Sequence, residues 1–168
     1  GKLYAGIKFS TDGTSCALAV ACRTKDNAIF VEAIGCHPTR DGSGGLLDFL
    51  SKADLAAVAV DGASGQQLLA DAMKAAHLRS PVLPTVKQVI TANAAFEQAL
   101  FAQALCHAGQ PGLAQAASNC EKRAIGSNGG FGYRSLTEGG HIELLDSVIL
   151  AHWQCAEGKG KRRQRIRY

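Results

Sequence analysis

Three aspartates, Asp12, Asp61 and Asp146, have residue types and surroundings that could support chemistry. Asp61 ends an uninterrupted apolar run over residues 55–60, and Gly62 follows it. Converging carboxylates offer only oxygen donors, which suit Mg²⁺ or Mn²⁺ better than softer metals. Two such ions about 4 Å apart activate a water molecule and stabilise the leaving oxygen of a phosphodiester. The three acids therefore indicate metal-assisted phosphodiester hydrolysis, provided that the fold brings them together.

Each of these acids also has an ordinary structural role available. Asp12 belongs to the segment STDG, where an aspartate commonly caps a turn. Asp61 could cap a helix that begins after it, and Asp146 could pair with a neighbouring cation. Both interpretations stay open for each acid, so the site depends on the elements that carry them.

The length of 168 residues predicts a single domain with a substantial core. The net charge of +4 is unevenly distributed, because residues 159–168 hold six of the 18 basic side chains. The remaining body carries 12 basic and 14 acidic residues. We therefore predict a domain over residues 1–158 and a basic tail over residues 159–168. The tail is either a handle for polyanions or a merely solvated end.

The sequence shows no segment of the type that targets a protein to a membrane or across one. Its apolar runs are shorter than the roughly 20 residues that a bilayer requires. The six cysteines show no CxxC spacing, which favours reduced thiols over a zinc or disulfide framework. We expect a cytoplasmic protein without membrane association.

The first part of the chain predicts three strands in sequence. Residues 3–9 alternate between apolar and other side chains, and residues 14–23 and 28–34 are largely apolar. Short polar turns at residues 10–13 and 25–27 connect them, which indicates an antiparallel meander.

A glycine-rich loop over residues 35–45 and a short helix over residues 46–53 should follow the meander. The valine-rich run at residues 55–62 predicts a strand buried on both faces, in the middle of a sheet covered by helices. Asp61 then stands where open α/β sheets place their chemistry, at the carboxyl end of a strand.

The second half of the chain is mainly helical in pattern. Periodicity and breakers predict helices at residues 66–77, 85–105, 111–122 and 141–156, a very short strand at 81–84, and a mobile loop or loose hairpin at 126–140. This order of elements is that of the ribonuclease H-like fold, a mixed α/β sheet in which the meander is joined by parallel strands and flanked by helices. Such a fold places the end of the first strand beside Asp61 and allows the last helix to add Asp146.

Four segments resemble one protein family in the same order along the chain. They are YAGIKFSTDGTSCALAVA, VAVDG, PTVKQVITANAAFEQAL with LCHAGQPGLAQAASNC, and LLDSVILAHW. They are similar to the C-terminal nuclease domain of the large terminase subunit of tailed bacteriophages, the motor protein that cuts and packages DNA. The resemblance spans residues 4–153 and implies a ribonuclease H-like endonuclease that uses Mg²⁺ or Mn²⁺ on double-stranded DNA.

The resemblance assigns Asp61 and Asp146 to two of the three acids of the family's site. At the first position most members have Asp, whereas this chain has Lys8, and the nearest acid is Asp12. We expect one metal ion, bound mainly by Asp61 and Asp146 with Asp12 as an outer ligand, and Lys8 paired with these acids. The alternative is that Lys8 extends into solvent. His141 could orient a metal-bound water or be purely structural.

The resemblance also implies partners. No GxxxxGK[ST] phosphate loop occurs in the sequence, so we expect the family's ATPase domain to lie elsewhere in a longer protein. Portal and small terminase subunit are further partners that the family implies. Each basic residue predicted to meet DNA phosphates could instead be a solvated cation, and these residues are Lys122, Arg123, Arg134, Arg162, Arg163 and Arg165.

Two other functions compete with an active nuclease. GIKFSTDGTS resembles the phosphate-binding hairpin of actin and sugar-kinase proteins, which would make the chain a nucleotide-binding module. A catalytically weakened DNA-binding domain of the same fold is the other possibility, since Lys8 replaces an acid.

Overall fold

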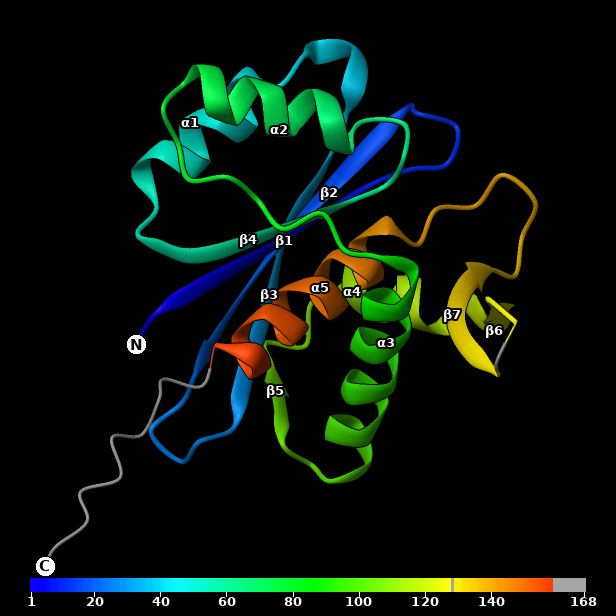
Figure 1. The fold of residues 1–168 in the computed structure, drawn as a ribbon. Helices are drawn as coiled ribbons and strands as arrows, with labels where there is room; N and C mark the ends of the chain where they lie inside the picture. Colours follow the sequence, from blue (N-terminus) through cyan, green and yellow to red (C-terminus); the bar gives the residue numbers. More distant parts are fainter. Residues whose placement is uncertain (128, 159–168) are drawn as a thin grey trace, which may run out of the picture.

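The computed structural model describes residues 1–127 and 129–158. A five-stranded mixed sheet lies at the centre of the fold (Figure 1). Its strand order is β4-β1-β2-β3-β5. The strands are β1 (Leu3–Phe9), β2 (Ser15–Arg23), β3 (Ile29–Pro38), β4 (Leu55–Asp61) and β5 (Leu105–His107). The first three form the predicted antiparallel meander, β4 pairs parallel with β1, and β5 pairs parallel with β3. The predicted mixed α/β sheet is therefore confirmed.

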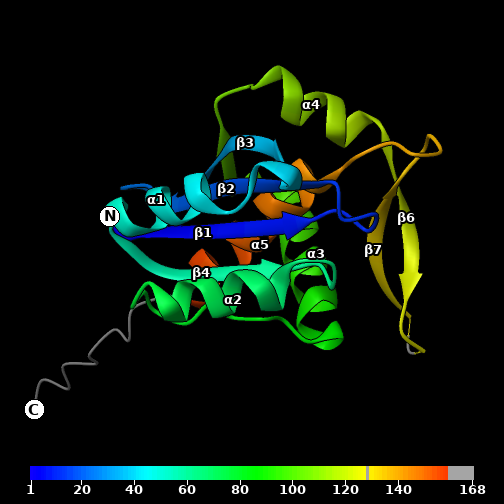
Figure 2. The same cartoon turned by 90° about the horizontal axis from the view of Figure 1, so that it is seen from above.

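Helices cover both faces of the sheet, as Figures 1 and 2 show. They are α1 (Gly44–Lys52), α2 (Gln66–Ala75), α3 (Val86–Phe101), α4 (Pro111–Ser118) and α5 (Glu143–Glu157), with a 3-10 turn η1 (Thr39–Asp41). One apolar core lies between the sheet and α1 and α2, and the other lies between the sheet and α3, α4 and α5. Among the described residues, no helix combines the length and apolar character needed to cross a membrane.

The alternation of β1 decides which side chains meet which helices. Ala5 and Ile7 are fully buried in the core under α1 and α2. Gly6 faces α5, and a Cβ built on it would lie 2.5 Å from the backbone nitrogen of Ala151 and closer still to the carbonyl oxygen of Ser147. Because only glycine leaves room there, α5 lies directly on β1.

The strand of residues 55–61 is not in the middle of the sheet, which corrects our prediction. β4 is one of the two edge strands of the sheet, and within the described part of the chain its free side meets Val82 in an isolated parallel bridge. The amide of Val60 donates to the carbonyl of Val82, and the amide of Val82 donates to Val58, at 2.9 and 2.8 Å. Prolines at positions 81 and 84 limit this neighbour to one bridging residue. Helices nevertheless cover both faces of β4.

The predicted helix at residues 85–105 begins as expected but ends earlier. Thr85 forms a capping box with Gln88, which fixes the start. The helix ends at Phe101, and Gln103 takes a left-handed conformation with φ of 52°. This turn lets Leu105 begin β5, a strand that the periodicity did not reveal. Phe101, predicted to face the core, is 81% exposed.

The side chain of Gln110 continues the edge of β3 beyond the short strand β5. β5 pairs with β3 only from Ile29 to Val31. Two residues later, Gln110 accepts a hydrogen bond from the amide of Ala33 at 2.8 Å and donates one to its carbonyl at 2.7 Å. One side-chain amide therefore satisfies both backbone groups of Ala33 on this edge.

A second, two-stranded sheet follows α4 and replaces part of a predicted helix. It consists of β6 (Cys120–Ile125) and β7 (Gly130–Ser135). The predicted helix at residues 111–122 ends at Ser118, so Lys122 and Arg123 lie on a strand. The predicted loop at residues 126–140 contributes β7, which carries Arg134. This hairpin projects from the body of the domain (Figures 1 and 2).

Candidate functional site

Lys8 and Asp61 lie side by side at the carboxyl ends of two parallel strands. The register of β1 and β4 pairs these two residues directly. The ammonium nitrogen of Lys8 lies 2.5 Å from Oδ2 of Asp61, and the two side chains are 22% and 19% exposed. The predicted pairing of Lys8 is confirmed for Asp61, and the alternative that Lys8 extends into solvent is wrong.

Asp146 approaches this ion pair from the first turn of α5. It lines one small cavity together with Lys8 and Asp61, and the volume of this cavity is about 20 Å³. A space of this size holds a single water molecule or ion. Burial raises the pKa of Asp146 to about 7, Lys8 opposes this rise, and the charge of Asp61 adds to it. The structure thus brings together two of the three predicted acids and the lysine.

Asp12 is held by its own turn and does not join the other two acids. Its Oδ1 accepts hydrogen bonds from the amide and hydroxyl of Thr14, at 3.0 and 2.7 Å, and from the hydroxyl of Ser10 at 2.7 Å. The Thr14 contacts lower the pKa of Asp12 to about 2. Within residues 1–127 and 129–158, no three His, Cys, Asp or Glu side chains are placed to hold a metal ion. The predicted three-acid cluster is therefore not formed.

The same turn bears on the nucleotide-binding alternative. A phosphate-binding hairpin needs free backbone donors. Here the amide of Thr14 already donates to Asp12, and the amide of Ser15 donates to the hydroxyl of Ser10 at 3.0 Å. The turn satisfies these donors internally and carries a carboxylate that repels phosphate.

The donor set at Asp61 and Asp146 fits one divalent cation better than two. Both groups offer oxygen ligands of the kind that Mg²⁺ and Mn²⁺ prefer. Two carboxylates carry two negative charges, and Lys8 already compensates one of them. A single dication leaves the three side chains and the ion with a net charge of about +1, whereas two would leave about +3 in a space for one ion.

His141 lies outside this cavity. It precedes α5, and its Nδ1 lies 3.3 Å from the carboxylate of Glu143. Both residues line a separate cavity of about 330 Å³ that also contacts Cys36. The predicted role of His141 in orienting a metal-bound water is therefore not supported by its place in the fold.

Asn93 contacts the site but was missed by sequence reasoning. It lies on α3, is 4% exposed, and lines the same cavity as Lys8, Asp61 and Asp146. The available signal was an amide between apolar residues on the buried side of a predicted helix. Such a polar side chain in a helix interior needs a partner or a function.

The hairpin of β6 and β7 carries three of the predicted DNA-binding residues. Lys122 pairs with Glu97 of α3 at 2.5 Å, and Arg134 pairs with Glu121 at 2.7 Å. Arg123 lies near enough to Asp146 to oppose the rise in the pKa of that carboxyl. The other three, Arg162, Arg163 and Arg165, lie outside the described residues.

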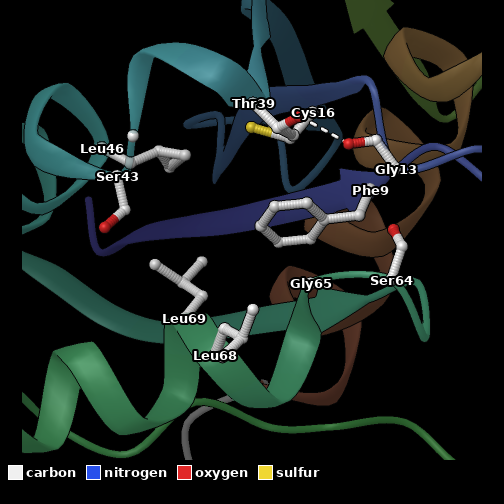
Figure 3. A pocket seen from close by; sticks show the side chains of 11 residues that line it. Phe9, Gly13, Cys16, Thr39, Ser43, Leu46, Ser64, Gly65, Leu68 and Leu69 are labelled. Atoms are coloured by element: carbon white, nitrogen blue, oxygen red, sulfur yellow. Dashed lines mark hydrogen bonds between the residues drawn. The ribbon is translucent and has the colours of Figure 1, made fainter.

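A different cavity, of about 320 Å³, lies on the opposite face of the sheet. Figure 3 shows the ring of Phe9 in it, with Leu68 and Leu69 of α2 on one side and Leu46 of α1 on the other. The thiol of Cys16 lies at its wall, and burial raises the pKa of that thiol to about 11. With an inert thiol and a mainly apolar lining, this cavity offers no evident chemistry.

Comparisons with known proteins support the fold. No protein-family model and no curated protein matches the sequence. The HK97 bacteriophage large terminase has a similar structure, with a TM-score of 0.69 and 16% identity over 91% of this chain and 39% of that chain. The nuclease of the large terminase from thermophilic phage G20c gives 0.63 and 17%, over 91% of this chain and 82% of that chain. The large terminase nuclease domain of Thermus phage P74-26 gives 0.61 and 17%, over 94% and 81%.

These likenesses establish what this chain shares with the three proteins. It spans about two fifths of the HK97 large terminase and most of each of the other two chains. The chain therefore has the fold of large terminase nuclease domains, as the sequence resemblance predicted.

Proposed function

We propose that this domain is the nuclease of a phage large terminase and cleaves double-stranded DNA during genome packaging with the help of Mg²⁺ or Mn²⁺. One observation carries the proposal. In a fold shared with terminase nucleases, Asp61 from a strand end and Asp146 from α5 meet Lys8 around a space for one ion. Carboxylates in such a position are suited to hydrolysis of a phosphodiester.

Each of the three side chains has a distinct role. Asp61 and Asp146 would hold one cation, which when bound polarises the scissile phosphate and lowers the pKa of a water molecule. Lys8 balances the charge of Asp61 and keeps its carboxylate oriented toward the cavity. Its remaining N–H groups can donate to a phosphate oxygen at the entrance.

Lys122, Arg123 and Arg134 would contact the DNA backbone on either side of the cut. Their hairpin stands beside the cavity, and its charges act without reading sequence. Glu97 and Glu121 already neutralise two of these cations. Arg123 is therefore the strongest candidate contact of the three. In the longer protein, an ATPase domain, the portal and the small terminase subunit would complete the packaging motor in the host cytoplasm.

A plasmid-cleavage assay tests the proposal. The wild-type domain should nick or linearise supercoiled DNA in Mn²⁺ or Mg²⁺ and not in EDTA. Asp61→Asn and Asp146→Asn should each lose roughly a hundredfold or more in rate, since the stabilisation lost is several kcal/mol. Asp48→Asn is the matched control, because Asp48 lies on α1, outside the site, and pairs with Lys52. Equal cutting by both site variants would exclude the assigned site.

A catalytically weakened DNA-binding domain is the second candidate. It is favoured by the ion pair of Lys8, which stands where most family members have an acid. This candidate predicts DNA binding that depends on salt, with no cleavage in either metal. Lys8→Asp would then be expected to create cleavage rather than to reduce it.

A further inference from the structure

We propose that the side-chain oxygen of Asn93 is a third protein ligand of the cation held by Asp61 and Asp146. The inference rests on the proposed function. Asn93 lines the same 20 Å³ cavity as the two carboxylates. It reaches this cavity from α3, so the ligands would come from three separate elements, β4, α3 and α5.

The hydrogen bonding of Asn93 engages one end of its amide with the backbone of its own helix. Its Nδ2 donates to the carbonyl oxygen of Val89, one turn earlier in α3, at 2.9 Å. The reversed amide would place two oxygens against each other, so the nitrogen must face Val89. Within the part of the chain that the structure describes, no donor bonds to Oδ1 of Asn93. The oxygen is thus available as a ligand for a cation in the cavity that Asn93 lines.

A free acceptor in this position selects the type of ligand. An amide oxygen has only lone pairs to offer, so it repels a phosphate oxygen and attracts a cation or a water proton. Asparagine oxygens are ordinary ligands of hard divalent cations. Asn93 as a whole is only 4% exposed, which limits how well bulk water can satisfy this oxygen.

Direct Mn²⁺ binding to the DNA-free domain tests the proposal, with free Mn²⁺ counted by electron paramagnetic resonance. Asn93→Ser can keep the hydrogen bond to Val89 while it removes the amide oxygen. This variant should weaken Mn²⁺ binding about tenfold or more. Asn93→Asp loses the hydrogen bond to Val89 but can turn its oxygens toward the cation and adds a negative charge, so it should tighten binding about tenfold.

The opposite directions of the two changes separate a ligand from a structural residue. A loss of folding would weaken binding in both variants, and weaker binding in both overturns the proposal. Thr91→Ala is the control. Thr91 donates to the carbonyl of Lys87 in the same way, at 3.0 Å, but lies exposed on α3 and should leave Mn²⁺ binding within twofold of the wild type.

Failure of this inference is distinguishable from failure of the proposed function. Mn²⁺ binding could depend on Asp61 and Asp146 and yet be unchanged in both Asn93 variants. That result overturns only the role of Asn93 as a ligand. Absence of Mn²⁺ binding in the wild-type domain overturns both the Asn93 ligand and the metal site.

Discussion

Replacement of Gly6 by alanine tests whether the close contact between β1 and α5 positions the site. The added Cβ would lie 2.5 Å from the backbone nitrogen of Ala151 and 2.9 Å from Cβ of Leu150. Ordinary contacts begin at 3.4 Å, so α5 must move away by about 1 Å. Backbone atoms of a helix cannot yield singly, and Asp146 must therefore move with the whole helix.

The expected cost follows from overpacking. Forced displacement of groups in a packed core typically lowers the free energy of unfolding by about 1–3 kcal/mol. For a domain of this length that corresponds to a fall in Tm of roughly 2–12 °C. The cleavage rate should change by a larger factor than the stability of the fold, because displacement of a carboxylate by about 1 Å can lower the rate about a hundredfold.

Thermal unfolding, Mn²⁺ binding and plasmid cleavage of the same preparation measure these effects. Gly45→Ala is the matched control, since Gly45 lies in α1 with nothing within 4 Å of a built Cβ. Alanine there should raise stability by about 0.5–1 kcal/mol through helix propensity. If Gly6→Ala matches the wild type in Tm, in Mn²⁺ affinity and in cleavage rate, the contact between β1 and α5 does not position Asp146.

Three further predictions concern charge. Burial lowers the pKa of His152 to about 4, so the folded protein holds this side chain neutral. The free energy of unfolding should therefore be constant above pH 6.5 and fall by roughly 3 kcal/mol as the pH drops toward 4. His152→Phe should flatten this pH dependence in urea titrations. Lys8→Met should lower the free energy of unfolding of the metal-free domain by about 1–3 kcal/mol. The same variant should bind Mn²⁺ more tightly in calorimetry, and weaker binding would refute the charge-balancing role of Lys8. Deletion of residues 159–168 should reduce the slope of log K against log salt for DNA binding by up to about five, whereas an unchanged slope would mark a passive tail.

The sequence predicted the elements that have a strong local signal. The alternation of β1 and the turn at Asp12 were both evident, as was the apolar stripe of α5, because each depends on neighbouring residues. Lys8 could be placed beside Asp61 because parallel strands align their carboxyl ends. The site's ion pair was thus predictable from two strand patterns and one topology.

Features that depend on distant contacts could not be predicted. β5 exists because Leu105 finds the edge of β3, and its three residues carry no periodicity of their own. Asp12 had two equally reasonable roles, and the local hydrogen bonds to Thr14 decided between them. Asn93 looked like an ordinary helical residue until the fold placed it against Asp61 and Asp146.

The hydrogen bonds of Gln110 bear on whether another chain could add a strand to the sheet beside β3. An exposed strand edge can template the addition of a strand from another molecule. At Ala33 the amide of Gln110 already occupies the donor and the acceptor that an incoming peptide would use. One side chain thereby acts as a local block to β-augmentation, at the point where β5 is too short to protect its neighbour.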